Sequence, residues 1–102
     1  MMYAVIVRFA IDVMHVEKFR GLVLFNAEQS LSKEEGCRVF DVCEMGDGEF
    51  WLYELYDDPE AFQLHLRTPH FLQFDAQATT WILEKSVRTG QHLAKTSSLQ
   101  LS

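Results

Sequence analysis

Residues 37–56 decide the fold, and they read CRVFDVCEMGDGEFWLYELY. Residues 37–45 and 49–56 are two strand-like runs, because β-branched and aromatic side chains favour extended backbone. The connector between them, Gly46-Asp47-Gly48, contains glycine and has the length of a hairpin loop. This stretch therefore predicts an antiparallel β-hairpin in the middle of the chain.

The residues before the hairpin predict a strand and then a helix. Residues 3–11 are rich in valine, isoleucine and aromatic residues on both alternating faces, which is typical of a strand that is covered on both sides. Asp12 is a candidate N-cap for the helix that follows. Residues 34–36 predict the end of this helix, with Gly36 in the left-handed conformation that helix ends favour. The inward stripe of the helix is expected to consist of Val16, Phe19, Val23, Asn26 or Ala27, and Ser30.

Two further helices and a strand are expected after the hairpin. The pair Asp58-Pro59 predicts a short helix over about residues 59–66. A second helical segment is expected over roughly residues 70–79, and a last strand over about residues 81–88, with Gly90 at its end. The order β-α-β-β-α-β is that of the α+β ferredoxin-like sandwich, in which helices cover one face of a four-stranded antiparallel sheet.

The composition limits the chain to one domain. A chain of 102 residues, 48% of them hydrophobic, has room for one modest core. We expect the domain to span residues 1–92, and residues 93–102 to form a C-terminal tail that is flexible or packed on a dimer partner. The formal net charge of −6 argues against nucleic acid and anionic membranes as partners, because both are themselves negatively charged.

The N-terminal residues and the cysteines indicate the compartment. The chain begins without a basic leader, and Arg8 and Asp12 interrupt its first apolar run well short of a membrane span. Cys37 and Cys43 fit neither a zinc motif nor a redox motif, and we expect both to be buried as small hydrophobic residues. Without an export signal or a disulfide framework, a cytoplasmic location is expected.

The expected sheet has apolar side chains on both of its faces. In the strand over residues 49–56, Trp51 and Tyr53 lie on the face opposite Leu52. The helices cover one face only, so a monomer would expose a larger apolar patch than soluble monomers usually carry. A homodimer that packs sheet against sheet would remove this patch.

Glu54 is the first candidate for chemistry, because it lies in the middle of a strand among apolar and aromatic neighbours. Burial there disfavours the charged carboxylate and raises its pKa, which suits a general acid or base near neutral pH. The alternative is a structural hydrogen bond or a salt bridge to an arginine. The residues alone leave both interpretations open.

His65 and His70 lie on either side of the helix break at Thr68-Pro69. Imidazoles suit proton transfer to or from an acidic carbon or a phenol, but a histidine at a helix end also bonds free carbonyl groups. The break keeps the two from sharing one helix face, and no third ligand of matching type lies nearby apart from scattered carboxylates. We therefore predict no metal site.

Asn26 and several aromatic residues complete the candidate site. The Asn26 amide either orients a substrate carbonyl or enolate, or ties its helix to the sheet. No nucleotide or flavin motif is present, so no cofactor is expected. The aromatic residues expected to bind a flat substrate, if they are not simply core, are Phe40, Tyr53, Phe62 and Phe71.

A longer motif resembles a known family. The run Glu54-x-Tyr56-x-Asp58-x-x-Ala61-Phe62-x-x-His65-x-x-Thr68-Pro69-His70-Phe71 is similar to the signature of the antibiotic biosynthesis monooxygenase family, a dimeric α/β-barrel group. The stretches Gly36-Cys37-x-x-Phe40-Asp41-Val42 and Asn26-Ala27-x-x-Ser30 resemble the second strand and the end of the first helix of that family. Glu35 stands where the family usually has proline. The resemblance extends to about Gly90.

The resemblance implies a homodimer with a pocket in each subunit, in which His65, His70, Glu54 and Asn26 are the candidate catalytic groups. The implied function is a cofactor-independent monooxygenase that acts on a small quinol, anthrone or other enolisable compound through an enolate-like anion. One alternative is an isomerase of a small phosphorylated carbonyl compound, of the kind that degrades autoinducer-2. Another is a non-catalytic, ligand-binding dimeric module. His65 stands near the place of a tryptophan on which haem-degrading relatives depend, so haem is not expected.

Overall fold

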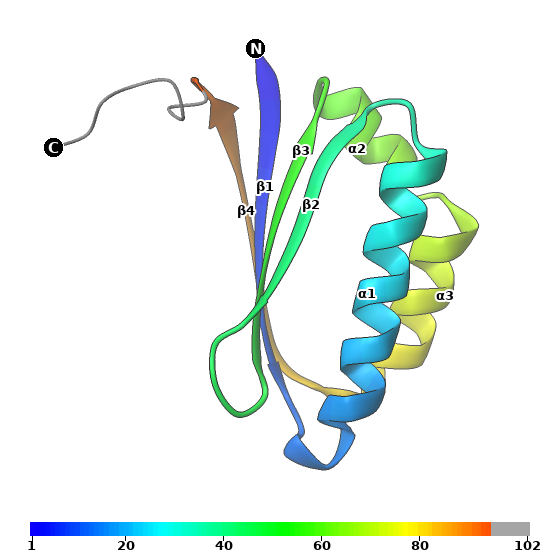
Figure 1. Ribbon diagram of the computed structural model, residues 1–102, viewed down its shortest axis with the longest axis vertical. Coiled ribbons are helices and arrows are strands. Elements are labelled where there is room, and N and C mark those ends of the chain that lie inside the picture. The colour runs from blue at the N-terminus through cyan, green and yellow to red at the C-terminus, as the bar shows by residue number, and fades with distance from the viewer. Residues whose placement is uncertain (95–102) are drawn as a thin grey trace, which may run out of the picture.

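The computed structural model describes residues 1–94, which form a four-stranded sheet with helices on one face (Figure 1). The strands are antiparallel and lie in the order β2-β3-β1-β4. The predicted α+β ferredoxin-like fold is therefore confirmed. In chain order the elements are β1 (Met2–Ile11), η1 (Val13–His15), α1 (Val16–Lys33), β2 (Cys37–Glu44), β3 (Glu49–Tyr56), α2 (Pro59–His65), α3 (Pro69–Ala78), η2 (Thr79–Trp81) and β4 (Ile82–His92).

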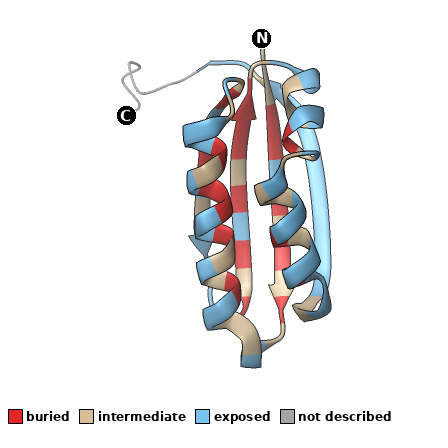
Figure 2. Cartoon of the chain, turned by 90° about the vertical axis from the view of Figure 1, so that its right-hand side faces the viewer, coloured by how far each residue is buried: buried red, intermediate tan, exposed pale blue. Residues whose placement is uncertain are grey.

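The core lies between the helices and the two central strands, β1 and β3. Figure 2 shows these strands as largely buried in the space between α1 and the pair α2 and α3. Phe19 of α1 packs on Phe9 and Phe50, with ring centroids 5.2 and 4.9 Å apart. Because successive side chains point to opposite faces of a strand, Glu54 lies in the same inward row of β3 as Tyr56.

The predicted hairpin is confirmed, and its glycines have distinct reasons to be there. Gly46 and Gly48 have φ angles of +131° and +77°, which side chains with a Cβ rarely adopt. A Cβ on Gly48 would also lie 2.5 Å from the carbonyl oxygen of Ile11. The Gly48 carbonyl accepts a hydrogen bond of 2.7 Å from the Ile11 amide, so the hairpin turn is tied to the end of β1.

The helix α1 ends at Lys33, as the predicted break at residues 34–36 requires, but Gly36 does not have the positive φ expected of it. The C-cap is Glu34, whose backbone is extended with φ −99° and ψ 115°. Gly36 is required for a different reason, since a Cβ there would lie 2.6 Å from the Cβ of Ala61. Its carbonyl also accepts a hydrogen bond of 2.9 Å from the Asp57 amide. The glycine therefore lets α2 pack directly against the loop that carries Glu34.

Replacing Gly36 by alanine should lower the free energy of unfolding by about 1–3 kcal/mol, the usual cost of overpacking. Gly21→Ala is the matched control, because Gly21 lies within α1 and an added Cβ would meet nothing within 4 Å. That control should be stabilising by roughly 0.5–1 kcal/mol, since alanine favours helix more than glycine does. Urea unfolding measures the free energy of unfolding of both variants. If the two substitutions change this free energy equally, the close approach of Gly36 to Ala61 is contradicted.

β4 is longer than predicted and is poorly covered. It passes through Gly90, which was expected to end it, because its pairing with β1 continues to Met2 and His92. Almost all of its residues are exposed, including Lys85 and Val87 on the side that faces the helices, and Figure 2 shows this strand in pale blue beyond α3. The sandwich is therefore open along its β4 edge.

The sheet face away from the helices is partly apolar and uncovered. Ile6 and Trp51 on this face are 41% and 39% exposed.

Cys43 is exposed, so the prediction that both cysteines are buried is wrong for this one. Cys37 is buried as predicted, and burial raises the pKa of its thiol to about 12. Residues 95–102, most of the predicted tail, lie outside the described residues. Within residues 1–94, no helix is both long and apolar enough to span a membrane.

Candidate active site

A narrow cavity of about 50 Å³ lies between the sheet and the helices. Its wall is mostly apolar. Four polar side chains also line it: the amide of Asn26, the carboxyl group of Glu54, the imidazole of His65 and the ammonium group of Lys85. Asn26, Glu54 and His65 are each no more than 3% exposed. A mostly apolar hollow with a few converging polar groups is the usual form of a small-molecule site.

Glu54 is buried at the centre of β3, as predicted. Burial raises the pKa of its carboxyl group, against a smaller opposing effect of the hydrogen bond from Tyr56 and of the nearby His65. The Tyr56 hydroxyl donates this hydrogen bond to Glu54 Oε1 over 2.5 Å, and the pKa of Tyr56 is raised far above its ordinary value by its own burial and by Glu54. Glu54 is therefore both hydrogen-bonded and disposed to hold a proton.

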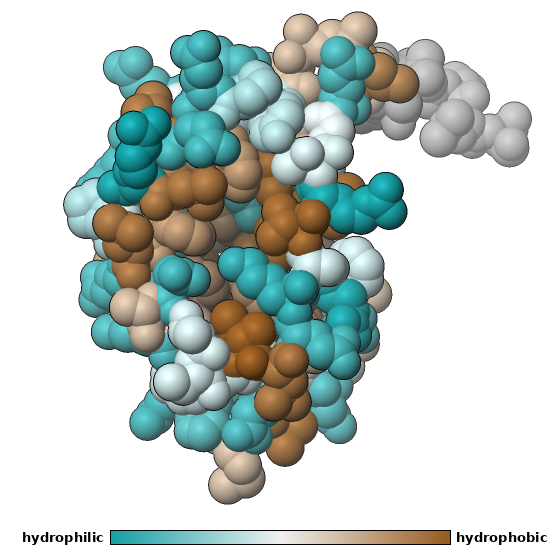
Figure 3. Space-filling view, turned by 180° about the vertical axis from the view of Figure 1, so that it is seen from behind, coloured by the Kyte–Doolittle hydropathy of each residue, from teal (hydrophilic) through white to brown (hydrophobic). Residues whose placement is uncertain are grey.

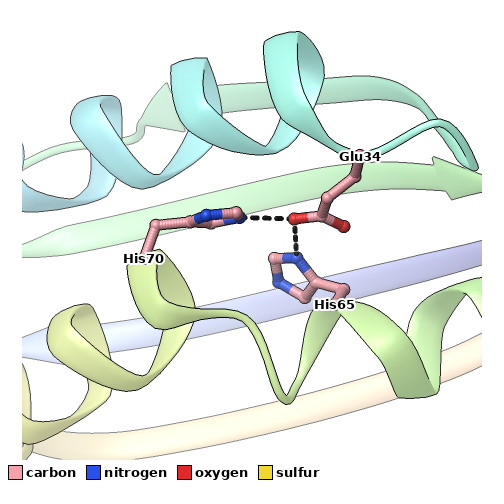
Figure 4. Close-up of side chains that lie close together, drawn as sticks. All are labelled: Glu34, His65 and His70. Carbon is pink, nitrogen blue, oxygen red and sulfur yellow. Dashed lines mark hydrogen bonds and ion pairs between the residues drawn. The ribbon is translucent and has the colours of Figure 1, made fainter.

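Glu34 is the site residue that sequence reasoning missed. Its carboxylate Oε2 lies 2.8 Å from His65 Nδ1 and 2.5 Å from His70 Nε2, as Figure 4 shows. One signal for it was available, because Glu34 follows Ser30 by four residues and so continues the inward stripe of α1. The extended backbone at Glu34 then leads the chain into β2.

The two histidines lie on different helices, as predicted from the break between them, and the break brings both rings to one carboxylate. His65 is the last residue of α2, and His70 lies in the first turn of α3. Between them, Thr68 Oγ1 donates to the His65 carbonyl at 2.8 Å and accepts from the Phe71 amide at 3.2 Å. Thr68 thus caps α3 and fixes it to the end of α2, so that both rings reach one carboxylate from different helices.

The Glu34 carboxylate sets the orientation of the His65 ring. Burial on its own raises the pKa of Glu34, but hydrogen bonds with His65 and His70 outweigh it, and the net change is a lowering. An ionised carboxylate only accepts hydrogen bonds, so His65 Nδ1 carries the proton that it donates to Glu34. Glu34 lies outside the cavity that His65 lines. His65 Nε2 is then the ring nitrogen that offers a lone pair on the cavity side.

Asn26 has an unused polar atom at the cavity. Its Oδ1 is buried and has no hydrogen-bond partner among residues 1–94. A buried amide oxygen without a partner is uncommon in native proteins and is explained when a ligand or a water completes it. Asn26 therefore brings to the wall of the cavity a buried amide oxygen without a partner in the described part of the chain.

The predicted substrate-binding aromatic residues divide between the two faces of the sheet. Phe40, Phe62 and Phe71 line the cavity. Tyr53 does not, because it neighbours Glu54 in β3 and points to the opposite face, where its hydroxyl lies 3.0 Å from His92 Nδ1. His70 also lies outside the cavity, behind Glu34. The structure thus brings Asn26, Glu54 and His65 together and places His70 one contact away.

The family of the chain follows from a comparison of sequences. The sequence profile described as antibiotic biosynthesis monooxygenase matches residues 2–77, which is more than half of the chain. The chain belongs to this family. The matched residues include Asn26, Glu34, Glu54 and both histidines of the site, whereas Lys85 lies beyond them.

Solved structures of similar proteins agree with this assignment. A Nitrosomonas europaea protein named "Putative antibiotic biosynthesis monooxygenase" is 27% identical, with a TM-score of 0.86 and 90% of each chain covered. A Mycobacterium tuberculosis structure, Rv0793, is 28% identical, with a TM-score of 0.85, and covers 95% of this chain and 100% of its own. The curated protein "Putative monooxygenase Rv0793" is 42% identical over 45 residues, which are 43% of this chain and 45% of that protein. The sequence match thus spans under half of that relative.

The cavity of this family member is too small for an aromatic ring in its present form. A cavity that admits benzene measures roughly 150 Å³, against about 50 Å³ here. Lys85 and Val87 line it from the open β4 edge. Figure 3, seen from the side on which β4 is the edge of the sheet, shows apolar side chains around a recess in the surface. Entry of a ring-sized substrate therefore requires the side chains at this edge to move.

The Glu34, His65 and His70 side chains are also a possible set of metal ligands. One ligand atom from each lies within 4.8 Å of the others. The expectation of no metal site rested on the lack of a third ligand beside the two histidines, and the structure places Glu34 in that position.

Proposed function

We propose that this protein is a monooxygenase that acts, without a cofactor of its own, on a small quinol, anthrone or other enolisable compound. The observation that carries the proposal is the carboxylate–imidazole pair, Glu34 and His65, whose free Nε2 faces a mostly apolar cavity. A carboxylate that holds an imidazole in one tautomer prepares the other ring nitrogen to act as a general base. The family membership supports the oxygen chemistry.

The first step is removal of a proton from the substrate. His65 Nε2 takes this proton from a phenolic or enolic hydroxyl, and Glu34 stabilises the imidazolium that forms. Electron density then moves onto the substrate oxygen and carbon, and the anion reacts with dioxygen. For an anthrone the balance is CH₂ + O₂ → C=O + H₂O, so the substrate supplies all the electrons and no separate reductant is needed.

Two further side chains hold the substrate oxygens. Asn26 Oδ1 accepts a hydrogen bond from a substrate hydroxyl, which completes its unused hydrogen-bonding capacity. Glu54, whose carboxyl pKa is raised by burial, donates its proton in a hydrogen bond to the oxygen on which charge develops. A buried neutral carboxyl group stabilises an enolate more than the neutral substrate, which is what accelerates the reaction.

An isomerase of phosphorylated compounds receives less support from the cavity, because a phosphate group requires cations. Lys85 is the only lysine or arginine that lines the cavity among the described residues. Arg8 is paired with Glu49 and Glu84, and Arg38 with Asp57. Arg88 lines the hollow on the opposite face of the sheet.

Oxygen consumption tests the proposed function. The protein is incubated with a panel of quinols and anthrones, and oxygen uptake is followed with an electrode. We expect at least one substrate to accelerate uptake above the rate without protein, and the rate to fall in a His65 variant. A binding module predicts tight binding of an aromatic ligand with no uptake, and that result across the panel would contradict the proposal.

We also propose that two copies form a dimer through the open face of the sheet, around Ile6 and Trp51. Trp51→Glu should convert the dimer to a monomer at micromolar concentration, because the dimer contact would then have to bury the charged carboxylate of the new glutamate among apolar side chains. Leu24→Glu is the matched control, since Leu24 is 50% exposed on α1, which lies on the other side of the sheet. Sedimentation velocity measures the mass, and a monomeric wild-type protein would contradict the proposed dimer.

A further inference from the structure

We propose that Glu34, His65 and His70 form a binding site for one divalent transition-metal ion, such as Zn²⁺. The three ligand atoms, Glu34 Oε2, His65 Nδ1 and His70 Nε2, lie within 4.8 Å of one another. They come from the end of α1, the end of α2 and the start of α3. Two imidazoles and one carboxylate are a ligand set that proteins use for zinc and for other first-row divalent ions.

The geometry needs a local rearrangement of all three side chains to hold the ion. Both ring nitrogens already point at one place, which Glu34 Oε2 occupies in Figure 4 at 2.8 and 2.5 Å. Around a tetrahedral zinc ion with bonds of ~2.0–2.1 Å, neighbouring ligand atoms lie roughly 3.3 Å apart. The carboxylate must therefore withdraw by less than about 1 Å, and the two ring nitrogens, which lie up to 4.8 Å apart, must approach each other by roughly 1.5 Å before the ion fits between the three atoms. Glu34 is the most exposed of the three side chains, at 11% against 2% for His65 and 8% for His70.

An entry path to this site exists on the side away from the cavity. Glu34 and His70 line a surface groove of about 440 Å³ between α1 and the start of α3. An ion enters from this groove, and water from it fills the fourth coordination position. Lys33 also lines the groove and opposes a cation, but its side chain is exposed and its charge is screened by water. Ser30 Oγ lies 3.4 Å from His65 Nδ1, so its hydroxyl is next to the ligand atom itself.

The ion would switch off the base of the proposed reaction, and this consequence rests on the proposed function. A neutral imidazole that binds a metal through Nδ1 carries its proton on Nε2. His65 Nε2 would then face the cavity as a donor and could no longer accept a proton from the substrate. The site is thus inhibitory, and a chelator should restore activity.

Calorimetric titration of Zn²⁺ into the full chain, first freed of metal with a chelator, tests the site without any substrate. We expect one ion per chain with a Kd of about 1 μM or tighter. Glu34→Gln should weaken binding by more than the ~10–100-fold known for changes around a metal site, because it removes a ligand. Glu35→Gln is the matched control, since Glu35 is an exposed neighbour of the same charge, and it should bind as the wild type does.

Co²⁺ provides a second readout. Tetrahedral Co²⁺ gives visible absorption bands that free Co²⁺ lacks, and these bands should be lost in Glu34→Gln and in His70→Gln but kept in Glu35→Gln. Thermal melting shows whether each variant is folded. Absence of binding by the wild type, or equal affinity of Glu34→Gln and Glu35→Gln, would overturn the site. If Zn²⁺ binds but oxygen uptake is unaffected, the inhibitory role is wrong. If no substrate is oxidised at all, the proposed function fails while calorimetry still decides the metal site.

Discussion

Replacing His65 by glutamine is expected to lower kcat for oxygen uptake by about 100- to 10,000-fold, the range in which a general base contributes. Glutamine retains hydrogen-bonding groups of similar reach, so Glu34 keeps a partner, but it cannot take up a proton. KM should change little, because the cavity walls and the substrate-binding groups remain. The measurement is steady-state oxygen uptake with the best substrate of the panel.

Two controls make this result specific. His15→Gln should leave kcat unchanged, because His15 stacks on Trp81 at a ring distance of 5.1 Å and does not line the cavity. His70→Gln should have a smaller effect than His65→Gln, since His70 contacts Glu34 and not the substrate. Full activity of His65→Gln would show that the base is another group, and an equal loss in both variants would show that the pair acts through Glu34 alone.

The fold could be predicted because its signals are local. Alternating apolar residues, the helix start at Asp58-Pro59 and a glycine-bearing connector each specify their own segment. The errors occurred where distant segments meet. Gly36 was assigned a left-handed backbone, whereas its small size is needed against Ala61. Gly90 was expected to end β4, but pairing with β1 carries the strand past it.

The site was predictable residue by residue but not as an arrangement. The burial of Glu54 followed from its apolar neighbours, and the two histidines were recognised as a pair across a helix break. The two histidines are connected through Glu34, which follows a different helix, α1. No spacing in the sequence predicts a contact between Glu34 and the histidines. Tyr53 was assigned to the substrate pocket together with Glu54, although adjacent residues of a strand face opposite sides. The structure places it on the open face of the sheet.

Replacing Glu54 by leucine is expected to lower kcat by about 100- to 1,000-fold, as for loss of one hydrogen bond to a developing oxyanion. Glu54→Gln should retain much more activity, because its amide still donates to the substrate oxygen and still accepts from Tyr56. Equal losses in the two variants would contradict the role of a neutral donor and would point to the ionised carboxylate as the active form.

The same substitution by glutamine should alter how stability depends on pH. Burial raises the Glu54 pKa above its ordinary 4.5, so the folded protein holds a proton that the unfolded chain has already released. Where the folded state binds more protons, the free energy of unfolding falls as pH rises. The contribution of Glu54 is therefore complete below pH 4.5 and is lost as pH rises through the raised value. Glu54→Gln cannot ionise and should not show this fall.

At about pH 8, Glu54→Gln is therefore expected to be more stable than the wild type, within the ~0.5–2 kcal/mol typical of stabilising substitutions. Urea unfolding at several pH values measures the difference, which should vanish near pH 4. Ionisation of Glu54 removes the proposed hydrogen-bond donor, so we expect kcat of the wild type to fall as pH rises through the raised pKa of Glu54, and this fall should be weaker in Glu54→Gln. If Glu54→Gln is no more stable than the wild type at any pH, Glu54 serves mainly as the hydrogen-bond partner of Tyr56. A gain in stability at high pH would instead mean that the cavity keeps a carboxyl group that destabilises the fold, which is the pattern expected of a residue retained for its chemistry.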